Sequence, residues 1–237
     1  MLTLRRNGKL LVQEVKPVGE SFHESLLEAT QRSVRRLDVE GRRVGYVHLW
    51  SCTGRQGIGA FTRIIRDSLA HMDGVILDLR DGYGGAWFEY LDPFFKDRRE
   101  FAVITARHQS GDPIAIPPKV VIPHPWFRGP LVAIVNEGTR SGKEGMAYQL
   151  KKTGRARLVG SRTAGAFSGG KTILPAGQSS YVLYVAYTWL LLDGEALEGR
   201  GVVPDIEVPY PLGRSVEGDP QLERAIEEMR MLLVHDR

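Results

Sequence analysis

The chain has 237 residues, 42% of them apolar, and its 32 basic and 28 acidic residues give a net charge of +4. That length and apolar content fit one large domain with a sizeable core, or a domain with a small appendage. The basic residues are spread among the acidic ones and form no dense cluster, so the composition does not indicate a nucleic-acid partner.

The sequence shows neither the cysteine pattern of a disulfide-stabilised protein nor the apolar segments of a membrane protein or a signal peptide. Its single cysteine, Cys52, excludes an intrachain disulfide framework and a cysteine-based metal cluster. No stretch reaches the length of a membrane span, and residues 1–6 lack the apolar core of a signal peptide. We expect a chain that is soluble as given, exported if a longer precursor carries a signal, and otherwise cytoplasmic.

The first half of the chain alternates β-prone and helical segments. Asn7-Gly8 between two β-prone runs is a strong hairpin signal, and Glu40-Gly41 joins a second pair whose later strand is apolar enough to be central. The predicted elements are a hairpin over 2–18, a linker over 17–29 that leads into a short helix, a hairpin over 33–50, a helix over 57–71, a strand over 74–80 and a helix over 87–95.

The second half continues this alternation. It is predicted to hold a strand over 101–106, an irregular loop over 111–129, a strand over 131–135, a helix over about 142–152, strands over 157–160, 171–175 and 180–187, a segment over 190–193, a loop over 195–201 closed by 202–208, and a helix over 220–233 capped by Asp219. Strands separated by helices argue for an α/β core.

Ser141 lies at the junction between the apolar run 131–135 and the helix that follows it. A serine at a helix N-terminus has its hydroxyl beside unpaired backbone N–H groups, which favour a developing negative charge. That position suits a nucleophile, and the N–H of Gly142 could help to hold an oxyanion. The alternative is that Ser141 only caps the helix, with Glu144 as its capping-box partner.

A second glycine-containing turn follows the apolar strand that ends near Asp78. Gly84 and Gly85 let the backbone turn back and present successive N–H groups as an anion-binding site, the natural second half of an oxyanion hole. The alternatives are a simple tight turn between strand and helix, or a dinucleotide site, although the glycines do not fit the Gly-x-Gly-x-x-Gly spacing.

Four motifs occur along the chain in a fixed order. They are Asp-Leu-Arg-x-x-x-Gly-Gly from Asp78, Val-Asn-x-Gly-Thr-x-Ser-x-x-Glu from Val135, Val-Gly-x-Arg-Thr-x-Gly from Val159, and Gly-x-Gly-Val-x-Pro-Asp from Gly199. Each motif is modest alone, but the four in this order resemble the C-terminal processing (tail-specific) serine peptidases. The resemblance covers about residues 44–208.

This resemblance implies an α/β fold of the crotonase/ClpP type, with a core of stacked β-sheets and helices. It also implies that Ser141 is the nucleophile, and that Gly142, Gly84 and Gly85 supply the N–H groups of the oxyanion hole.

The same resemblance implies a domain organisation. In the fuller proteins of the family a peptide-binding PDZ domain precedes the core, and the N-terminal hairpin resembles the last strands of that domain. We therefore expect a β-hairpin appendage over 1–20 and a serine peptidase-like core over 21–237.

One position departs from the pattern of the processing peptidases. Their general base is a lysine in Thr-[Phe/Tyr]-Gly-Lys-Gly, and the corresponding stretch here is Thr163-Ala-Gly165-Ala166-Phe167. Because alanine cannot accept a proton, a Ser–Lys dyad does not carry over. The departure brings the chain closer to the tricorn-like and retinoid-binding-protein-like branch, in which the tricorn-like members use Ser, His and Glu.

The motifs identify the acidic and basic catalytic residues less clearly than they identify the serine. Glu198 matches the placement of the tricorn-like glutamate, with a solvated loop carboxylate as the alternative. The tricorn-like histidine comes from a region ahead of the PDZ domain; within this chain His48, near the end of a core strand, is the best candidate, although a strand histidine is commonly structural. Lys143 is a further candidate base if the helix start is irregular, since a regular first turn would point its amine away.

The implied function is that of a serine endopeptidase, which binds an extended peptide by strand addition and cleaves it through an acyl-enzyme on Ser141. The expected catalytic set is Ser141, Glu198 and His48, without metal or cofactor. The expected partner is a peptide or protein substrate, and a homo-oligomer is left open. The alternative is a catalytically impaired family member that binds a peptide or an apolar ligand. A crotonase-type acyl-CoA enzyme is a third reading, which the motif matches disfavour.

Overall fold

The computed structural model describes residues 1–16, 21–85, 88–108, 111–119, 125–174, 182–210 and 218–235. Its elements are β1 (Leu2–Arg6), β2 (Lys9–Gln13), α1 (Phe22–Ser33), β3 (Arg35–Val39), β4 (Arg42–His48), β5 (Ser51–Cys52), α2 (Gly54–Arg63), a π-helical turn (Ile64–Ser68), β6 (Gly74–Asp78), β7 (Tyr83–Gly85), α3 (Phe88–Leu91), a 3₁₀ turn (Asp92–Phe94), β8 (Ile104–His108), β9 (Ile114–Ile116), β10 (Leu131–Val135), α4 (Gly142–Lys152), β11 (Arg157–Gly160), β12 (Ser168–Ile173), β13 (Leu183–Leu192), β14 (Glu195–Ala196), β15 (Ile206–Glu207) and α5 (Pro220–His235).

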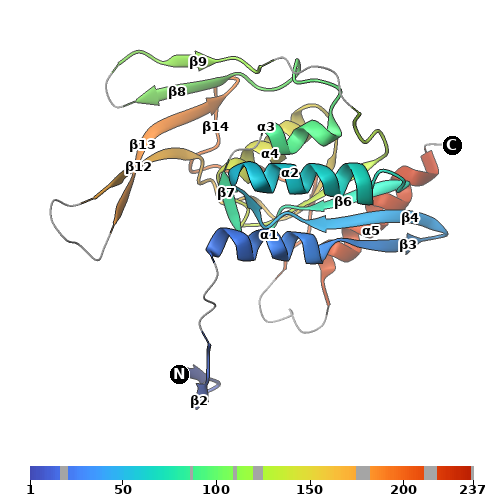
Figure 1. Ribbon diagram of the computed structural model, residues 1–237, viewed down its shortest axis with the longest axis horizontal. Coiled ribbons are helices and arrows are strands. Elements are labelled where there is room, and N and C mark those ends of the chain that lie inside the picture. Colours follow the sequence, from blue (N-terminus) through green and yellow to red (C-terminus); the bar gives the residue numbers. More distant parts are fainter. Residues whose placement is uncertain are drawn as a thin grey trace.

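A six-stranded sheet in the order β15-β11-β10-β6-β4-β3 forms the centre of the molecule (Figure 1). Its strands pair in parallel except for the β3–β4 hairpin at one edge. The inner strands β6 and β10 are buried along their whole length. This burial explains why they appear in the sequence as continuous apolar runs and not as alternating patterns.

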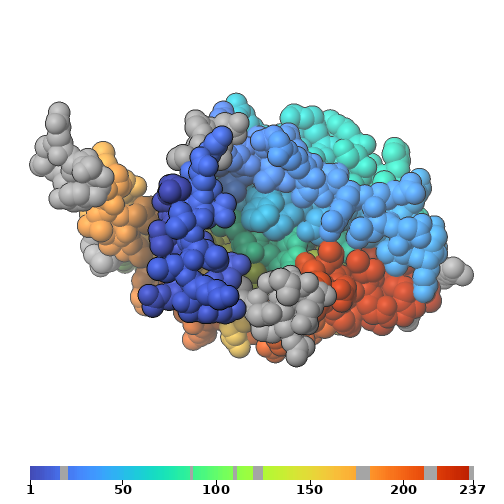
Figure 2. All heavy atoms as spheres, turned by 90° about the horizontal axis from the view of Figure 1, so that it is seen from below, coloured from blue at the N-terminus to red at the C-terminus, as the bar shows by residue number. Residues whose placement is uncertain are grey.

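Helices cover both faces of this sheet, so that each inner strand contributes side chains to two hydrophobic cores. Val75 and Leu77 of β6 belong to the core under α2, α3 and α4, whereas Ile76 points to the opposite core with Ala225 and Met229 of α5. This alternation follows from the period-two geometry of a strand. Figure 2 shows α5 (red) along the underside of the molecule. The result is a mixed α/β architecture of layered sheets and helices.

A second sheet, in the order β12-β13-β8-β9 with β14 attached to β13, lies beside the first (Figure 1). The inner end of β13 is anchored in the main core by Leu192. Its outer part extends beyond the body (orange in Figure 2) and exposes large apolar side chains on both faces, among them Tyr184 (67% exposed) and Trp189 (63% exposed).

The N-terminal hairpin forms as predicted. β1 and β2 pair in antiparallel fashion around Asn7 and Gly8, whose φ values of 51° and 77° fit a tight two-residue hairpin turn. Every strand residue of this hairpin is exposed. Among the described residues, no helix combines the length and apolar content needed to cross a bilayer.

The structure corrects two predicted segments. The region assigned to a linker is mostly helix: α1 runs over Phe22–Ser33, and its buried Thr30 hydroxyl accepts a hydrogen bond from the Trp50 N–H at 3.0 Å. Tertiary contacts of this kind stabilise a helix whose sequence signal is weak. The proline-rich loop contains β9, since Ile116 pairs with Ile104 of β8; a three-residue strand is too short to show a period.

Candidate active site

Ser141 and the glycine turn follow neighbouring parallel strands at one edge of the central sheet. Ile134 of β10 lies opposite Asp78 of β6 in the register. The pairing continues past the strand ends, since the Leu79 N–H donates to the Ile134 carbonyl at 2.9 Å. The Thr139 hydroxyl then donates to the Leu79 carbonyl at 3.0 Å. The parallel topology therefore brings together two motifs that are far apart in the sequence.

Ser141 has an unusual backbone for a helix-capping serine. Its φ of 55° and ψ of −128° lie outside the β region that ordinary N-cap residues occupy. Its N–H donates to the Ala166 carbonyl at 3.0 Å and to the Glu144 carboxylate at 3.1 Å. Ser141 and Glu144 thus form a capping box, but the serine backbone is held in a strained strand–turn–helix conformation of the kind that exposes nucleophiles.

The Gly84–Gly85 turn packs directly against this helix start. A methyl group added to Gly84 would lie 2.5 Å from the Ser141 Cβ, and one added to Gly142 would overlap the Gly85 carbonyl oxygen. Only glycine fits at these positions without displacing the backbone. The three glycines predicted from the motifs therefore meet beside the serine.

Glu144 is fully buried and binds more groups than its place in a capping box predicts. Its carboxylate accepts hydrogen bonds from the Thr163 hydroxyl at 2.6 Å, the Gly165 N–H at 2.7 Å and the Ala166 N–H at 2.8 Å, besides the Ser141 N–H. These bonds tie the 163–166 loop to the serine. Both motifs were visible in the sequence, but nothing in their spacing showed that one binds the other.

Glu198 follows β14 and binds the residues that come directly after the 163–166 loop. Its carboxylate accepts hydrogen bonds from the Phe167 N–H at 2.7 Å and from the Ser168 hydroxyl at 2.8 Å. The adjacent residue, Ala166, contacts Ser141 through its carbonyl. Glu198 is therefore joined to the surroundings of Ser141 through residues 166–168.

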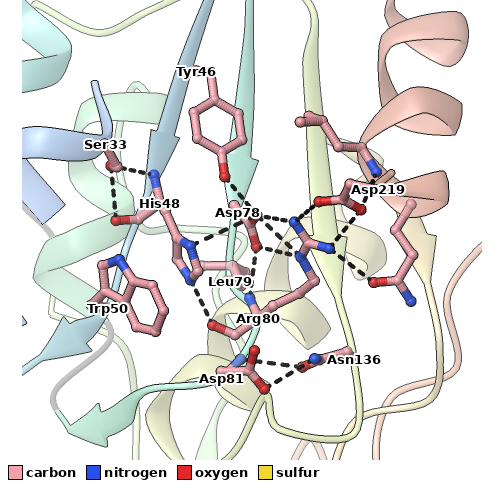
Figure 3. Close-up of polar contacts among 12 residues, drawn as sticks. Ser33, Tyr46, His48, Trp50, Asp78, Leu79, Arg80, Asp81, Asn136 and Asp219 are labelled. Carbon is pink, nitrogen blue, oxygen red and sulfur yellow. Dashed lines mark hydrogen bonds and ion pairs between the residues drawn. The ribbon is translucent and has the colours of Figure 1, made fainter. Parts of the chain in front are cut away.

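His48 is engaged in a buried polar network (Figure 3). Its Nε2 lies 2.8 Å from the Arg80 carbonyl, to which it must donate, and its Nδ1 lies 3.9 Å from the Asp78 carboxylate. The ring stacks on Trp50 with centroids 3.9 Å apart. Burial lowers the pKa of His48 below its usual 6.5, despite the attraction of Asp78. These contacts face the glycine turn and do not include Ser141.

The same network connects the glycine turn to α5. Arg80 donates to both carboxylate oxygens of Asp78, with the shortest bond at 2.6 Å, and to Asp219 at 2.7 Å (Figure 3). Tyr46 donates to Asp78 at 2.8 Å. Burial alone would raise the pKa of Asp78, but the Arg80 hydrogen bonds and the charges of His48 and Arg80 hold it below the usual range.

Lys143 is fully buried, at 0% exposed, although it is the second residue of α4. Its amine donates to the Asp81 carbonyl at 2.7 Å and to the Arg80 carbonyl at 3.3 Å. Burial lowers its pKa from 10.5 to about 8. The irregular helix start therefore directs this amine into the glycine turn.

A model of "Peptidase family S41" matches residues 43–208, which is well over half of the chain. The chain belongs to peptidase family S41. The match spans the nucleophile candidate, the glycine turn and Glu198.

The S41 relatives are longer than this chain. It is 29% identical over 188 residues to the tricorn protease of Thermoplasma volcanium, covering 78% of the chain and 17% of that protein. It is 25% identical over 233 residues to a probable CtpA-like serine protease of Staphylococcus aureus, covering 90% of the chain and 46% of that protein. The chain thus spans less than half of the length of these relatives.

Solved structures show the same S41 fold. Mature CPAF, complexed with lactacystin, aligns over 99% of this chain and 68% of its own, with a TM-score of 0.67 and 13% identity. The photosystem II D1 C-terminal processing protease aligns over 81% and 48%, with a TM-score of 0.55 and 20% identity.

Other histidines of the chain lie away from Ser141 in sequence and are placed as follows. His23 packs edge-on against Tyr83 at 6.1 Å between ring centroids, and His108 contacts the Thr188 hydroxyl at 2.9 Å. His124 and the side chain of His235 lie outside the described residues. Within the described part of the chain, no group of three or more His, Cys, Asp or Glu residues is arranged to hold a metal ion.

Proposed function

We propose that this S41 domain is a serine endopeptidase of the tail-specific type, which cleaves an extended peptide through an acyl-enzyme on Ser141. The observation that carries the proposal is the strained φ of 55° at Ser141, beside Gly84, Gly85 and Gly142. Strain of about 1–3 kcal/mol persists only where the surroundings impose it, and it clusters at active sites. A serine that only capped the helix would need no such conformation.

The Ser141 hydroxyl would attack the scissile carbonyl carbon while a base takes its proton. The carbonyl oxygen would become an oxyanion that accepts hydrogen bonds from Gly142 N–H and from Gly84 or Gly85 N–H. The leaving amine would then take the proton, and water would release the acyl group from the serine.

Glu198 would orient a base and not act as one itself, because it is joined to Ser141 only through the 166–168 backbone. His48 and Lys143 are poorly placed to accept the proton, since their nitrogens face the Arg80 and Asp81 carbonyls. Ala166, at the place of the processing-peptidase lysine, has no basic group. We therefore propose that the base is a group other than His48, Lys143 and Glu198.

The peptide would bind along β12. This strand is the outer member of the second sheet as described, and it begins at Ser168, two residues after the Ala166 carbonyl that holds Ser141. An outer strand offers unpaired backbone groups to an extended peptide. Such strand addition would deliver the scissile bond to the serine.

A fluorophosphonate probe tests the proposal, because it reacts with activated serines in an oxyanion hole. With added imidazole as an external base, the native chain should be labelled at Ser141, as mapped by mass spectrometry. Ser141→Ala and the heat-denatured chain should remain unlabelled. If the native chain is silent while a known S41 peptidase is labelled in parallel, the enzyme proposal fails, and the binding-module alternative gains support.

A further inference from the structure

Lys143 is a buried charge that the proposed chemistry does not use. Lysine is almost never fully buried unless its amine is paired. Here the partners are two main-chain carbonyls, those of Arg80 and Asp81. The amine therefore binds the backbone of the turn that leads to Gly84 and Gly85.

That turn needs external support. Asp81 has a φ of 49° and Gly82 a φ of 71°, so two consecutive residues adopt the left-handed conformation, which costs free energy at an aspartate. Asn136 supports the turn from one side, since its side-chain oxygen accepts from the Asp81 N–H at 3.2 Å. Lys143 supports the carbonyl side, where a methyl group on Gly82 would lie 3.2 Å from its Nζ.

Lys143 also belongs to the same helical turn as the nucleophile. Ser141 and Gly142 contact Gly84 and Gly85 directly, and Lys143 reaches from the next position to the carbonyls just before them. One helix start therefore holds the glycine turn at both ends. Loss of either contact would let the turn move relative to the serine.

We propose that Lys143 is a positioning residue, which holds the 81–85 turn against the start of α4 so that its amides keep the geometry of the oxyanion hole. This inference rests on the proposed peptidase function. It assigns to Lys143 a role in aligning the oxyanion donors and no role in proton transfer from Ser141.

The variant test compares Lys143→Met with Lys152→Met. The first removes the two hydrogen bonds and keeps the buried alkyl chain, whereas the second removes a lysine of the same helix that pairs with Asp193 at the surface. With imidazole present, fluorophosphonate labelling of Ser141 should slow at least ~10-fold in Lys143→Met, below the ~10²–10³-fold cost of deleting a whole oxyanion donor. Lys152→Met should react like the wild type. For a cleavable peptide, the loss should fall on kcat and leave KM unchanged.

The possible outcomes are distinct. An unlabelled wild type would overturn the peptidase proposal and this inference with it. A labelled wild type with equal rates in Lys143→Met would overturn only the inference. Lys143→Gln keeps an amide donor and should recover part of the rate.

A second measurement needs no variant, should Lys143→Met and Lys143→Gln fail to fold. The titratable groups around the amine are His48, Cys52, Asp78 and Asp81. Burial lowers the pKa of His48 and raises that of Cys52 to about 12, and Asp78 is held below its usual range. Between pH 7 and 9.5, Lys143 itself should lose its proton and with it the stronger, charge-assisted hydrogen bonds.

Amide hydrogen exchange of the wild-type protein measures whether the turn loosens when Lys143 loses its proton. After correction for intrinsic exchange rates, protection of the Tyr83 amide, which donates to the Trp50 carbonyl at 2.8 Å, should fall across this pH range, while protection in β10 stays constant. Constant protection of the Tyr83 amide would overturn the inference.

Discussion

Ser141 adopts an energetically unfavourable backbone conformation. At φ 55° and ψ −128° a side chain is strained, whereas glycine adopts such angles readily. The strain is maintained by the hydrogen bonds of its N–H to Ala166 and Glu144. Stability and chemistry should therefore oppose each other at this residue.

This conflict predicts that Ser141→Gly unfolds at a higher denaturant concentration than Ser141→Ala. Alanine keeps the strain and glycine relieves it, so the free energy of unfolding should differ by about 1 kcal/mol in favour of glycine. Neither variant should react with the fluorophosphonate. Urea unfolding monitored by tryptophan fluorescence measures the difference. Equal stabilities would mean that Ser141 is not strained in solution.

At the scale of elements, the site is a contact between the start of α4 and the β6–β7 turn. The sequence predicted β10 and α4 well, because a fully apolar run and a serine–glycine helix start are local signals. It did not predict the burial of Lys143 or the bonds of Glu144. Those depend on the Ser141 backbone and on segments from β6 and from 163–166, which only the parallel pairing brings close.

The contact predicts a large effect of Gly142→Ala. Its methyl group would overlap the Gly85 carbonyl oxygen, so either the helix start or the turn must move. Ser141 labelling should fall ~10²-fold or more, as when an oxyanion donor is lost. Gly59→Ala in α2 is the matched control, because its methyl group would meet only the flexible end of Arg63, at 3.5 Å. Near-wild-type labelling of Gly142→Ala would show that the two elements are not tightly apposed.

At the scale of the whole molecule, the Asp78–Arg80–Asp219 network joins the central sheet, the glycine turn and α5. The sequence placed His48 correctly on a core strand but not its partners, because the Arg80 carbonyl and Asp78 come from a neighbouring strand. His48 contacts the Arg80 carbonyl, just ahead of the glycine turn, at 2.8 Å. The same buried groups therefore stabilise the fold and hold the geometry of the site.

This network predicts that acid destabilises the protein in two steps. The pKa of His48 is lowered in the folded state, so its contribution is present above about pH 6.5, the unfolded value, and is lost as the pH falls further. The pKa of Asp78 is also lowered, so its contribution is lost below about pH 3.9. Unfolding midpoints measured from pH 8 to 3 should show both steps, and His48→Gln should lack the first. Retention of the first step in His48→Gln would assign it to another group.

The most direct test of the whole account is a crystal structure of the chain after reaction with the fluorophosphonate. The phosphonyl group should be bonded to Ser141 Oγ, and its anionic oxygen should lie about 2.7–3.1 Å from Gly142 N and from Gly84 or Gly85 N. If the oxygen points away from the glycine turn, or if the adduct is on another residue, the assignment of this site as a serine peptidase centre is wrong.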